Sequence, residues 1–271
     1  MHKLGFSMMV SHPDNPGVSE QIPIFAQAGY DTFFLATGVT GEFNRIPEWA
    51  DIGRKNGIAF EAVHAPAGGA NAIWAEDDSC EGYLAMIRGL IDLCSNGGVD
   101  KLVMHVTAGA APAICQKGFD RYAALEDYAE GKQVQLCFEN GDRVDHLMAV
   151  LEHCSDYHGF CIDIGHHLCY APQVPLLSKF GHKLKYTHIH DNMGIQRPGN
   201  PGDDMHLLPF DGILDWNWFA STLRNAGYEG TLNLELAARG KESYRSCTYP
   251  EFVAEAYKRI VKFRAMVEQT E

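Results

Sequence analysis

Residues 133–164 read QVQLCFENGDRVDHLMAVLEHCSDYHGFCIDI and show the pattern of a strand, a helix and a second strand in direct succession. The segments 133–139 and 160–164 are short and apolar, which is typical of strands, whereas 143–155 carries its apolar residues at helical spacing. A strand, a crossover helix and a strand in this order predict two parallel strands.

The same alternation extends through the rest of the chain in both directions. Strands are expected at 3–9, 31–36, 58–64, 101–106, 133–139, 160–164, 184–190 and 230–236. Helices are expected at 18–28, 43–56, 79–96, 119–130, 143–155, 173–180, 215–226 and 250–267. Eight such units predict an α/β fold of the (β/α)8 TIM-barrel type. No shift in composition marks an internal boundary, so we expect a single domain over residues 1–271.

The composition excludes several classes of function. The chain has 271 residues, 46% of them hydrophobic, yet no stretch approaches the roughly 20 apolar residues of a membrane helix. The N-terminus lacks the pattern of a signal peptide, so we expect a cytoplasmic protein, with its 8 Cys residues reduced. A net charge of −13 without a Lys/Arg cluster counts against nucleic acid and anionic membranes as partners.

In three of the expected strands, the row of side chains that faces the barrel interior ends in an acid. Side chains alternate along a strand, so the apolar row packs on the outer helices and the other row points inward. By this count Glu139, Asp163 and Glu235 all point into one barrel mouth. Three carboxylates would repel one another there and lose their solvation, and a divalent cation resolves both problems.

Imidazoles recur at the same end of the expected barrel. The third and fourth strands end in His64 and His105, and the seventh places His188 on its inward row. Three more candidates are His166, which follows Asp163 by three residues, and Asp204 and His206 in the long loop 191–214. A single histidine at a strand end is usually structural, but its recurrence favours a shared site. His64, His105, Asp204 and His206 would bind a second metal ion, contact substrate or support the first metal ion.

Seven segments, in this order, resemble the xylose isomerase-like barrel superfamily, which groups sugar phosphate isomerases and epimerases with endonuclease IV. They are His64-Ala65-Pro66, Phe138-Glu139-Asn140, residues 162–166 (IDIGH), residues 188–192 (HIHDN), Asp204-Met205-His206, residues 209–216 (PFDGILDW) and Leu234-Glu235. The resemblance covers essentially the whole chain. It implies Glu139, Asp163, His188 and Glu235 as ligands of a divalent ion, with Mn²⁺, Mg²⁺, Co²⁺ or Zn²⁺ suited to oxygen and imidazole donors.

The resemblance further implies a metal-dependent sugar isomerase or epimerase. Such an enzyme removes a proton α to a carbonyl and forms a metal-stabilised enediolate, with Glu139 and Glu235 moving the proton. His166, and with it His64, His105 and His206, would contact a small carbohydrate substrate. Epimerisation, aldose–ketose isomerisation and dehydration of the inosose or dehydroshikimate type all remain open. Ketose 3-epimerases carry an Arg shortly after the strand-seven histidine, and residues 191–194 (DNMG) lack it.

Two alternatives remain. The DNA-repair branch of the superfamily is a zinc-dependent phosphodiesterase that acts at abasic DNA and holds three zinc ions. Its ligands would match His64, His105, Glu139, Asp163, His166, His188, Asp204, His206 and Glu235. The other alternative is a barrel that binds sugar without turnover. Members of the superfamily are often dimers or tetramers, so the resemblance also favours a homo-oligomer.

Overall fold

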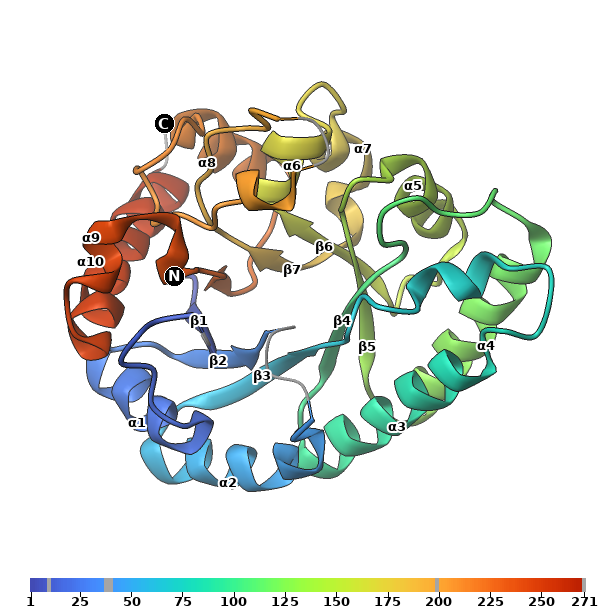
Figure 1. Ribbon diagram of the computed structural model, residues 1–271, viewed down its shortest axis with the longest axis horizontal. Helices are drawn as coiled ribbons and strands as arrows, with labels where there is room; N and C mark the ends of the chain where they lie inside the picture. The colour runs from blue at the N-terminus through green and yellow to red at the C-terminus, as the bar shows by residue number, and fades with distance from the viewer. Residues whose placement is uncertain (9–10, 37–40, 198–199, 270–271) are drawn as a thin grey trace.

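The computed structural model describes residues 1–8, 11–36, 41–197 and 200–269, and in it eight parallel strands form one sheet (Figure 1). The order along the sheet is β7-β6-β5-β4-β3-β2-β1-β8. Their bounds are β1 Leu4–Met8, β2 Thr32–Leu35, β3 Ala59–His64, β4 Lys101–His105, β5 Gln135–Glu139, β6 Gly159–Asp163, β7 Leu184–His188 and β8 Leu232–Leu234. Met9, which ends the first expected strand, lies outside the described residues.

The sheet closes on itself between β7 and β8. Just after β7, Ile189 N donates to Asn233 O at 2.7 Å, and Glu235 N donates back to Ile189 O at 3.2 Å. Ile189 and Leu234 thereby form a parallel bridge. The predicted (β/α)8 TIM barrel is confirmed.

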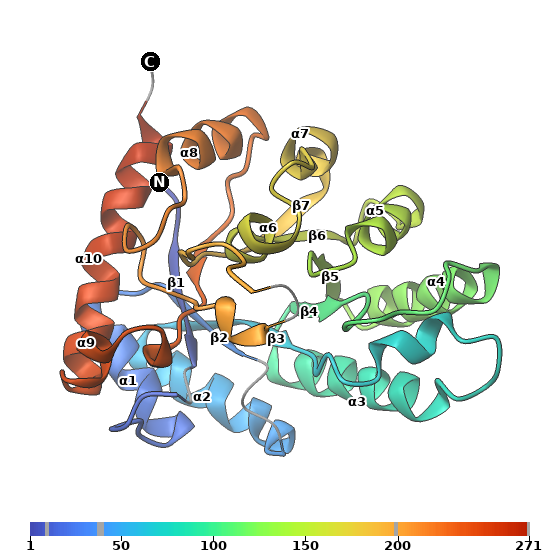
Figure 2. The ribbon, with the colours of Figure 1, turned by 45° about the horizontal axis from the view of Figure 1, so that its top comes forward.

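Helices surround this barrel, as Figures 1 and 2 show. Those that cover the strands are α1 Val18–Ala28, α2 Ile46–Asn56, α3 Glu81–Gly97, α4 Gln116–Gly131, α5 Val144–His153, α7 Leu176–Phe180, α8 Trp216–Asn225 and α10 Tyr249–Glu268. Each corresponds to an expected helix. The long α10 packs against α1 and α8 and so covers the place where the first and last strands meet.

Two short helices were not predicted. The helix α6, Ile164–Tyr170, begins directly at the end of β6, and Asp163 caps it by accepting a hydrogen bond from His166 N at 2.6 Å. The helix α9, Glu242–Arg245, lies in the loop after β8. The 3-10 turns Phe43–Arg45, Ala70–Trp74, Gly181–Lys183, Pro201–Asp203 and Ala238–Gly240 complete the described elements.

The strands separate two apolar cores, as the predicted alternation requires. The outward row, which includes Leu136, Ile162 and Leu234, joins the large core under the helices. The inward row forms a separate interior layer. That layer consists of Phe34, Ala62, Val103, Cys137, Cys161 and Tyr186. The next inward position on each strand therefore lies at the C-terminal mouth of the barrel.

Among the described residues, no helix combines the length and the apolar composition needed to cross a lipid bilayer.

Candidate metal centre

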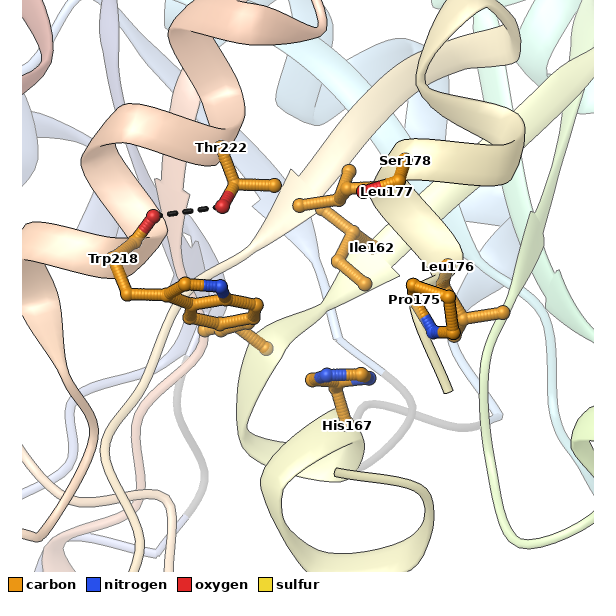
Figure 3. A pocket seen from close by; sticks show the side chains of 9 residues that line it. Ile162, His167, Pro175, Leu176, Leu177, Ser178, Trp218 and Thr222 are labelled. Carbon is orange, nitrogen blue, oxygen red and sulfur yellow. Dashed lines mark hydrogen bonds between the residues drawn. The ribbon is translucent and has the colours of Figure 1, made fainter. Parts of the chain in front are cut away.

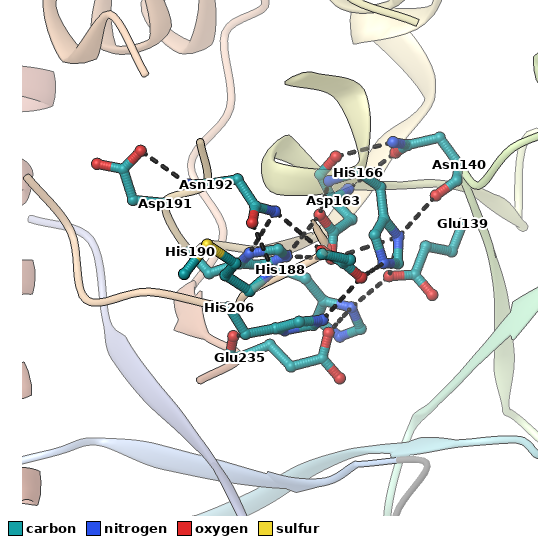
Figure 4. Close-up of polar contacts among 12 residues, drawn as sticks. Glu139, Asn140, Asp163, His166, His188, His190, Asp191, Asn192, His206 and Glu235 are labelled. Atoms are coloured by element: carbon teal, nitrogen blue, oxygen red, sulfur yellow. Dashed lines mark hydrogen bonds and ion pairs between the residues drawn. The ribbon is translucent and has the colours of Figure 1, made fainter. Parts of the chain in front are cut away.

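The four predicted ligands converge at the C-terminal mouth, as Figure 4 shows. One donor atom each from Glu139, Asp163, His188 and Glu235 lies within 4.8 Å of the other three. The first three side chains are completely buried, and Glu235 is 8% exposed. Three carboxylates so close together and so poorly solvated need a cation or protons among them. The chemistry of this donor set therefore fits a divalent metal ion.

His188 lies between the two glutamates. Its Nδ1 is 2.6 Å from Glu139 Oε1 and 3.4 Å from Glu235 Oε2. Burial alone would lower the pKa of His188, but the negative charges of Glu235 and Glu139 outweigh it and raise that pKa to about 9. Burial likewise opposes ionisation of Glu139, but the surrounding His105, His188 and His64 hold its pKa well below the usual range. Positive charge in this position is thus strongly favoured.

A second group consists of His64 at the end of β3 and His105 at the end of β4, which both approach Glu139. His64 Nδ1 lies 2.8 Å from Ala65 O, and because a carbonyl only accepts, this nitrogen carries the hydrogen. In a neutral ring the lone pair of His64 Nε2 then faces Glu139 Oε2 at 2.7 Å, and His105 Nε2 approaches the same oxygen at 3.1 Å. Burial foremost lowers the pKa of His105 to about 4. A cation between these three residues would remove the repulsion between the lone pairs.

A third group lies beside the first, in the loop after β7 and at the start of α6. His166 Nδ1 donates to Asn140 O and His206 Nδ1 donates to Glu235 O, both at 3.0 Å. Both Nε2 atoms consequently face one oxygen, Asp204 Oδ2, at 3.0 and 3.1 Å. Burial lowers the pKa of His206, but Asp204 outweighs it and raises that pKa to about 9. All three residues that the sequence proposed here are brought together.

His190 was not among the predicted ligands, yet the structure places it in this third group. Its Nε2 lies 2.9 Å from Asp163 Oδ1, and its ring stacks on His206 with centroids 3.9 Å apart. Gly165 makes room for it, because a Cβ there would lie 2.0 Å from His190 Cε1. The available signal was the inward row of the seventh strand, which His190 shares with His188.

Two asparagines were also missed. Asn140 Oδ1 accepts from Asp163 N, and Asn140 Nδ2 donates to Asp163 O, both at 2.8 Å. These bonds fix the end of β6 against the end of β5. Asn192 Nδ2 donates to Asp204 Oδ1 at 2.8 Å and orients that carboxylate. Both residues lie in segments that carry the family resemblance, shortly after predicted ligands, but that resemblance gave them no role.

A cavity of about 800 Å³ adjoins the centre through His105 and His166, which contact Glu139 and Asp163. His105, His166, Thr107, Asp142 and Tyr170 are among the residues that line it. Its described lining contains no Lys or Arg. A much smaller cavity, of about 70 Å³, lies outside the barrel beside His167 and Trp218 (Figure 3). The large cavity at the mouth is therefore the better place for a small polar ligand.

The sequence profile of the xylose isomerase-like TIM barrel family matches residues 23–258. The chain belongs to this family. A curated relative, the uncharacterized protein y4fM of Sinorhizobium fredii (strain NBRC 101917 / NGR234), is 30% identical over 166 residues, which are 55% of this chain and 51% of that protein. The chain thus spans about half the length of the curated relative it matches.

Several solved structures share the barrel. The IOLI protein with a bound zinc atom has a TM-score of 0.81 at 18% identity, over 99% of this chain and 100% of that chain. D-psicose 3-epimerase from Clostridium cellulolyticum H10, solved with D-tagatose, has a TM-score of 0.77 at 15% identity, over 98% and 100%. The 3-keto-D-glucoside 4-epimerase YcjR from E. coli has a TM-score of 0.71 at 15% identity, over 98% and 100%. At identities of 15–18%, the likeness to these three structures shows a shared fold and nothing about their activities.

Proposed function

We propose that the chain is a metal-dependent isomerase or epimerase of a sugar or sugar derivative. The observation that carries the proposal is the convergence of donor atoms from Glu139, Asp163, His188 and Glu235 within 4.8 Å of one another. A cavity of about 800 Å³ adjoins this group through His105 and His166. Structural neighbours that are sugar epimerases, and one that holds zinc, support this choice. The four residues would hold one divalent ion, namely Mn²⁺, Mg²⁺, Co²⁺ or Zn²⁺.

The ion would supply positive charge that stabilises the enediolate formed when a proton leaves the carbon next to a carbonyl. Glu139 and Glu235 come from β5 and from the end of β8, and both approach His188. One carboxylate removes the proton and the other returns it, a contribution of roughly 10²–10⁴-fold in rate. Return to the same carbon gives an epimer, and return to the neighbouring carbon gives an isomer. If a β-hydroxide leaves instead, the reaction is a dehydration.

The cavity favours a substrate without a phosphate group. Its described lining offers imidazoles, hydroxyls and the carboxylate of Asp142, but no cationic side chain that would pair with a phosphate. His105 and His166 line it directly and would contact the substrate. His64 and His206 lie behind them against Glu139 and Asp204.

The test is turnover of ketoses, inososes and hydroxypyruvate by protein reloaded with each divalent ion in turn. We expect conversion that depends on the ion and is lost on chelation. Absence of conversion across this panel, with the metal content verified, would reject the proposal.

The second candidate is a zinc phosphodiesterase that acts at abasic DNA. The two additional histidine groups around Glu139 and Asp204 favour it, because each directs Nε2 atoms at a shared carboxylate oxygen. The net charge of −13 opposes it, since phosphate contacts supply most of the affinity for DNA.

Metal content separates the two candidates. About three zinc ions per chain together with cleavage of an abasic duplex would favour the nuclease. One ion per chain without cleavage would favour the sugar enzyme.

A further inference from the structure

One cysteine lies directly beneath the proposed metal centre. Cys161 faces inward on β6, two residues before Asp163, and its register partner on β5 is Glu139. Its Sγ, a carboxylate oxygen of Glu139 and a ring nitrogen of His188 all lie within 4.8 Å of one another. All three side chains are fully buried. The sulfur is therefore close enough to share an ion with two of the proposed ligands.

His188 provides a second, independent observation. Its Nδ1 faces Glu139 at 2.6 Å, which leaves Nε2 on the other edge of the ring. Within the part of the chain that the structure describes, this Nε2 is buried and has no hydrogen-bond partner. The imidazole thus keeps an uncommitted buried nitrogen, and its ring packs against Phe34 and Tyr186 of the interior layer, to which Cys161 also belongs.

The neighbouring Cys137 serves as an internal comparison. It is as deeply buried as Cys161 and belongs to the same interior layer. It precedes Glu139 by two residues, but it is in none of the groups of described residues whose donor atoms lie close enough to hold a metal ion. Position on the strands, and not burial, distinguishes Cys161.

We propose that Cys161 is an additional ligand for thiophilic divalent cations, namely Zn²⁺, Co²⁺ and Cd²⁺, at the floor of this metal centre. The inference rests on the proposed function, because it presupposes an ion held by Glu139 and His188. As the metal–sulfur bond forms, the thiol S–H bond breaks and its proton leaves to solvent, so no oxidant or reductant is required. Harder ions such as Mn²⁺ and Mg²⁺ prefer oxygen donors and leave the thiol protonated. The chain would consequently retain zinc or cadmium more tightly than manganese.

Cobalt spectroscopy on the full chain tests this directly. Co²⁺ bound at the centre gives ligand-field bands in the visible range, and a thiolate ligand adds a charge-transfer band in the near ultraviolet. We expect both in the unaltered protein, loss of only the near-ultraviolet band in Cys161→Ser, and both bands in the control Cys137→Ser. Cys161→Ala repeats the experiment should the serine variant fold poorly.

The outcomes separate the two proposals. Visible bands without a near-ultraviolet band, or a near-ultraviolet band that persists in Cys161→Ser, overturn the role of Cys161 while the metal centre stands. Absence of both bands in the unaltered protein overturns the metal centre as well.

Metal competition gives a readout that does not depend on spectra. The affinity for Cd²⁺ should fall about tenfold or more in Cys161→Ser, which is the loss that even a supporting residue produces at a metal site. The affinity for Mn²⁺ should change much less. Equal changes for the two ions, measured by dialysis and metal analysis, would contradict the inference.

Discussion

Two adjacent layers inside the barrel are built by the same strands and yet are stabilised in opposite ways. The interior layer, with Cys137 on β5 and Cys161 on β6, is apolar and needs only packing. Two residues further along these strands, Glu139 and Asp163 are equally buried but charged. Packing alone cannot stabilise buried carboxylates. The mouth layer, formed by Glu139, Asp163, His188 and Glu235, therefore needs positive charge, either from protonated histidines or from the proposed ion. The contrast places the buried charges in one layer and apolar packing in the other, and Cys161 is the interior residue that we propose to serve both layers.

The largest effect should come from changing the charge of the mouth layer. Glu139→Gln keeps the shape of the side chain but removes a ligand and a proton acceptor, so turnover should fall by about 10²–10⁴-fold. The matched control is Glu61→Gln on β3, since that carboxylate pairs with Lys101 and Thr231, away from the centre. Steady-state rates for both variants make the comparison. Equal losses in the two variants would show that the mouth layer has no special role.

Removal of the metal should destabilise the whole protein. An ion present at a hundred times its dissociation constant contributes about 2.7 kcal/mol to the free energy of unfolding. In the metal-free protein, protons on His188 and His206 take over part of its role, because both pKa values rise from 6.5 to about 9. This contribution is complete below about pH 6.5 and is lost as the pH rises through about 9.

Thermal unfolding with and without a chelator, from pH 6 to pH 10, measures this effect. The melting temperature of the chelated protein should decline over that range, and the metal-loaded protein should decline less. Parallel curves would contradict a cation in the mouth layer.

A smaller effect is expected from a residue that supports the ligands. His190→Gln removes the imidazole that contacts Asp163 and stacks on His206, so metal affinity should fall about 10–100-fold. His167→Gln is the control, because this histidine lies on the same helix as His166 but faces the small outer cavity. An unchanged affinity in His190→Gln would limit that residue to packing.

The smallest effect belongs to the interior layer. The Tyr186 hydroxyl is buried and lacks a hydrogen-bond partner among the described residues. Tyr186→Phe should therefore raise the free energy of unfolding by about 1 kcal/mol and leave metal content unchanged. Chemical denaturation measures the first and metal analysis the second. A loss of stability would indicate a hydrogen bond to this hydroxyl.

The sequence predicted the barrel well because alternation along a strand is a local property. The inward row of Cys137 and Glu139 and the outward row of Leu136 and Phe138 follow from counting by two, and the structure agrees. Helix α6 was missed because Asp163 serves both as a proposed ligand and as a helix cap, and the cap is not visible without the backbone.

The sequence predicted which residues form the candidate site, but it did not predict which of their side chains contact one another. Glu139, Asp163 and Glu235 stood out because each ends an inward row of a strand, and the family resemblance selected His188 on the inward row of the seventh strand. The place of His190 depends on Gly165 leaving space for its ring, which is a contact between two strand ends. The approach of Cys161 to Glu139 and His188 likewise depends on the register between β5, β6 and β7. Tertiary relations of this kind are not encoded in any single segment.

The central claim is that a cation holds the buried carboxylates of the mouth layer together. Crystals grown with Mn²⁺ or Zn²⁺ and measured at the absorption edge of that metal would test it most directly. We expect an anomalous peak within bonding distance of Glu139, Asp163, His188 and Glu235. A map from metal-replete crystals without a peak there, or with those side chains turned away from a common point, would contradict it.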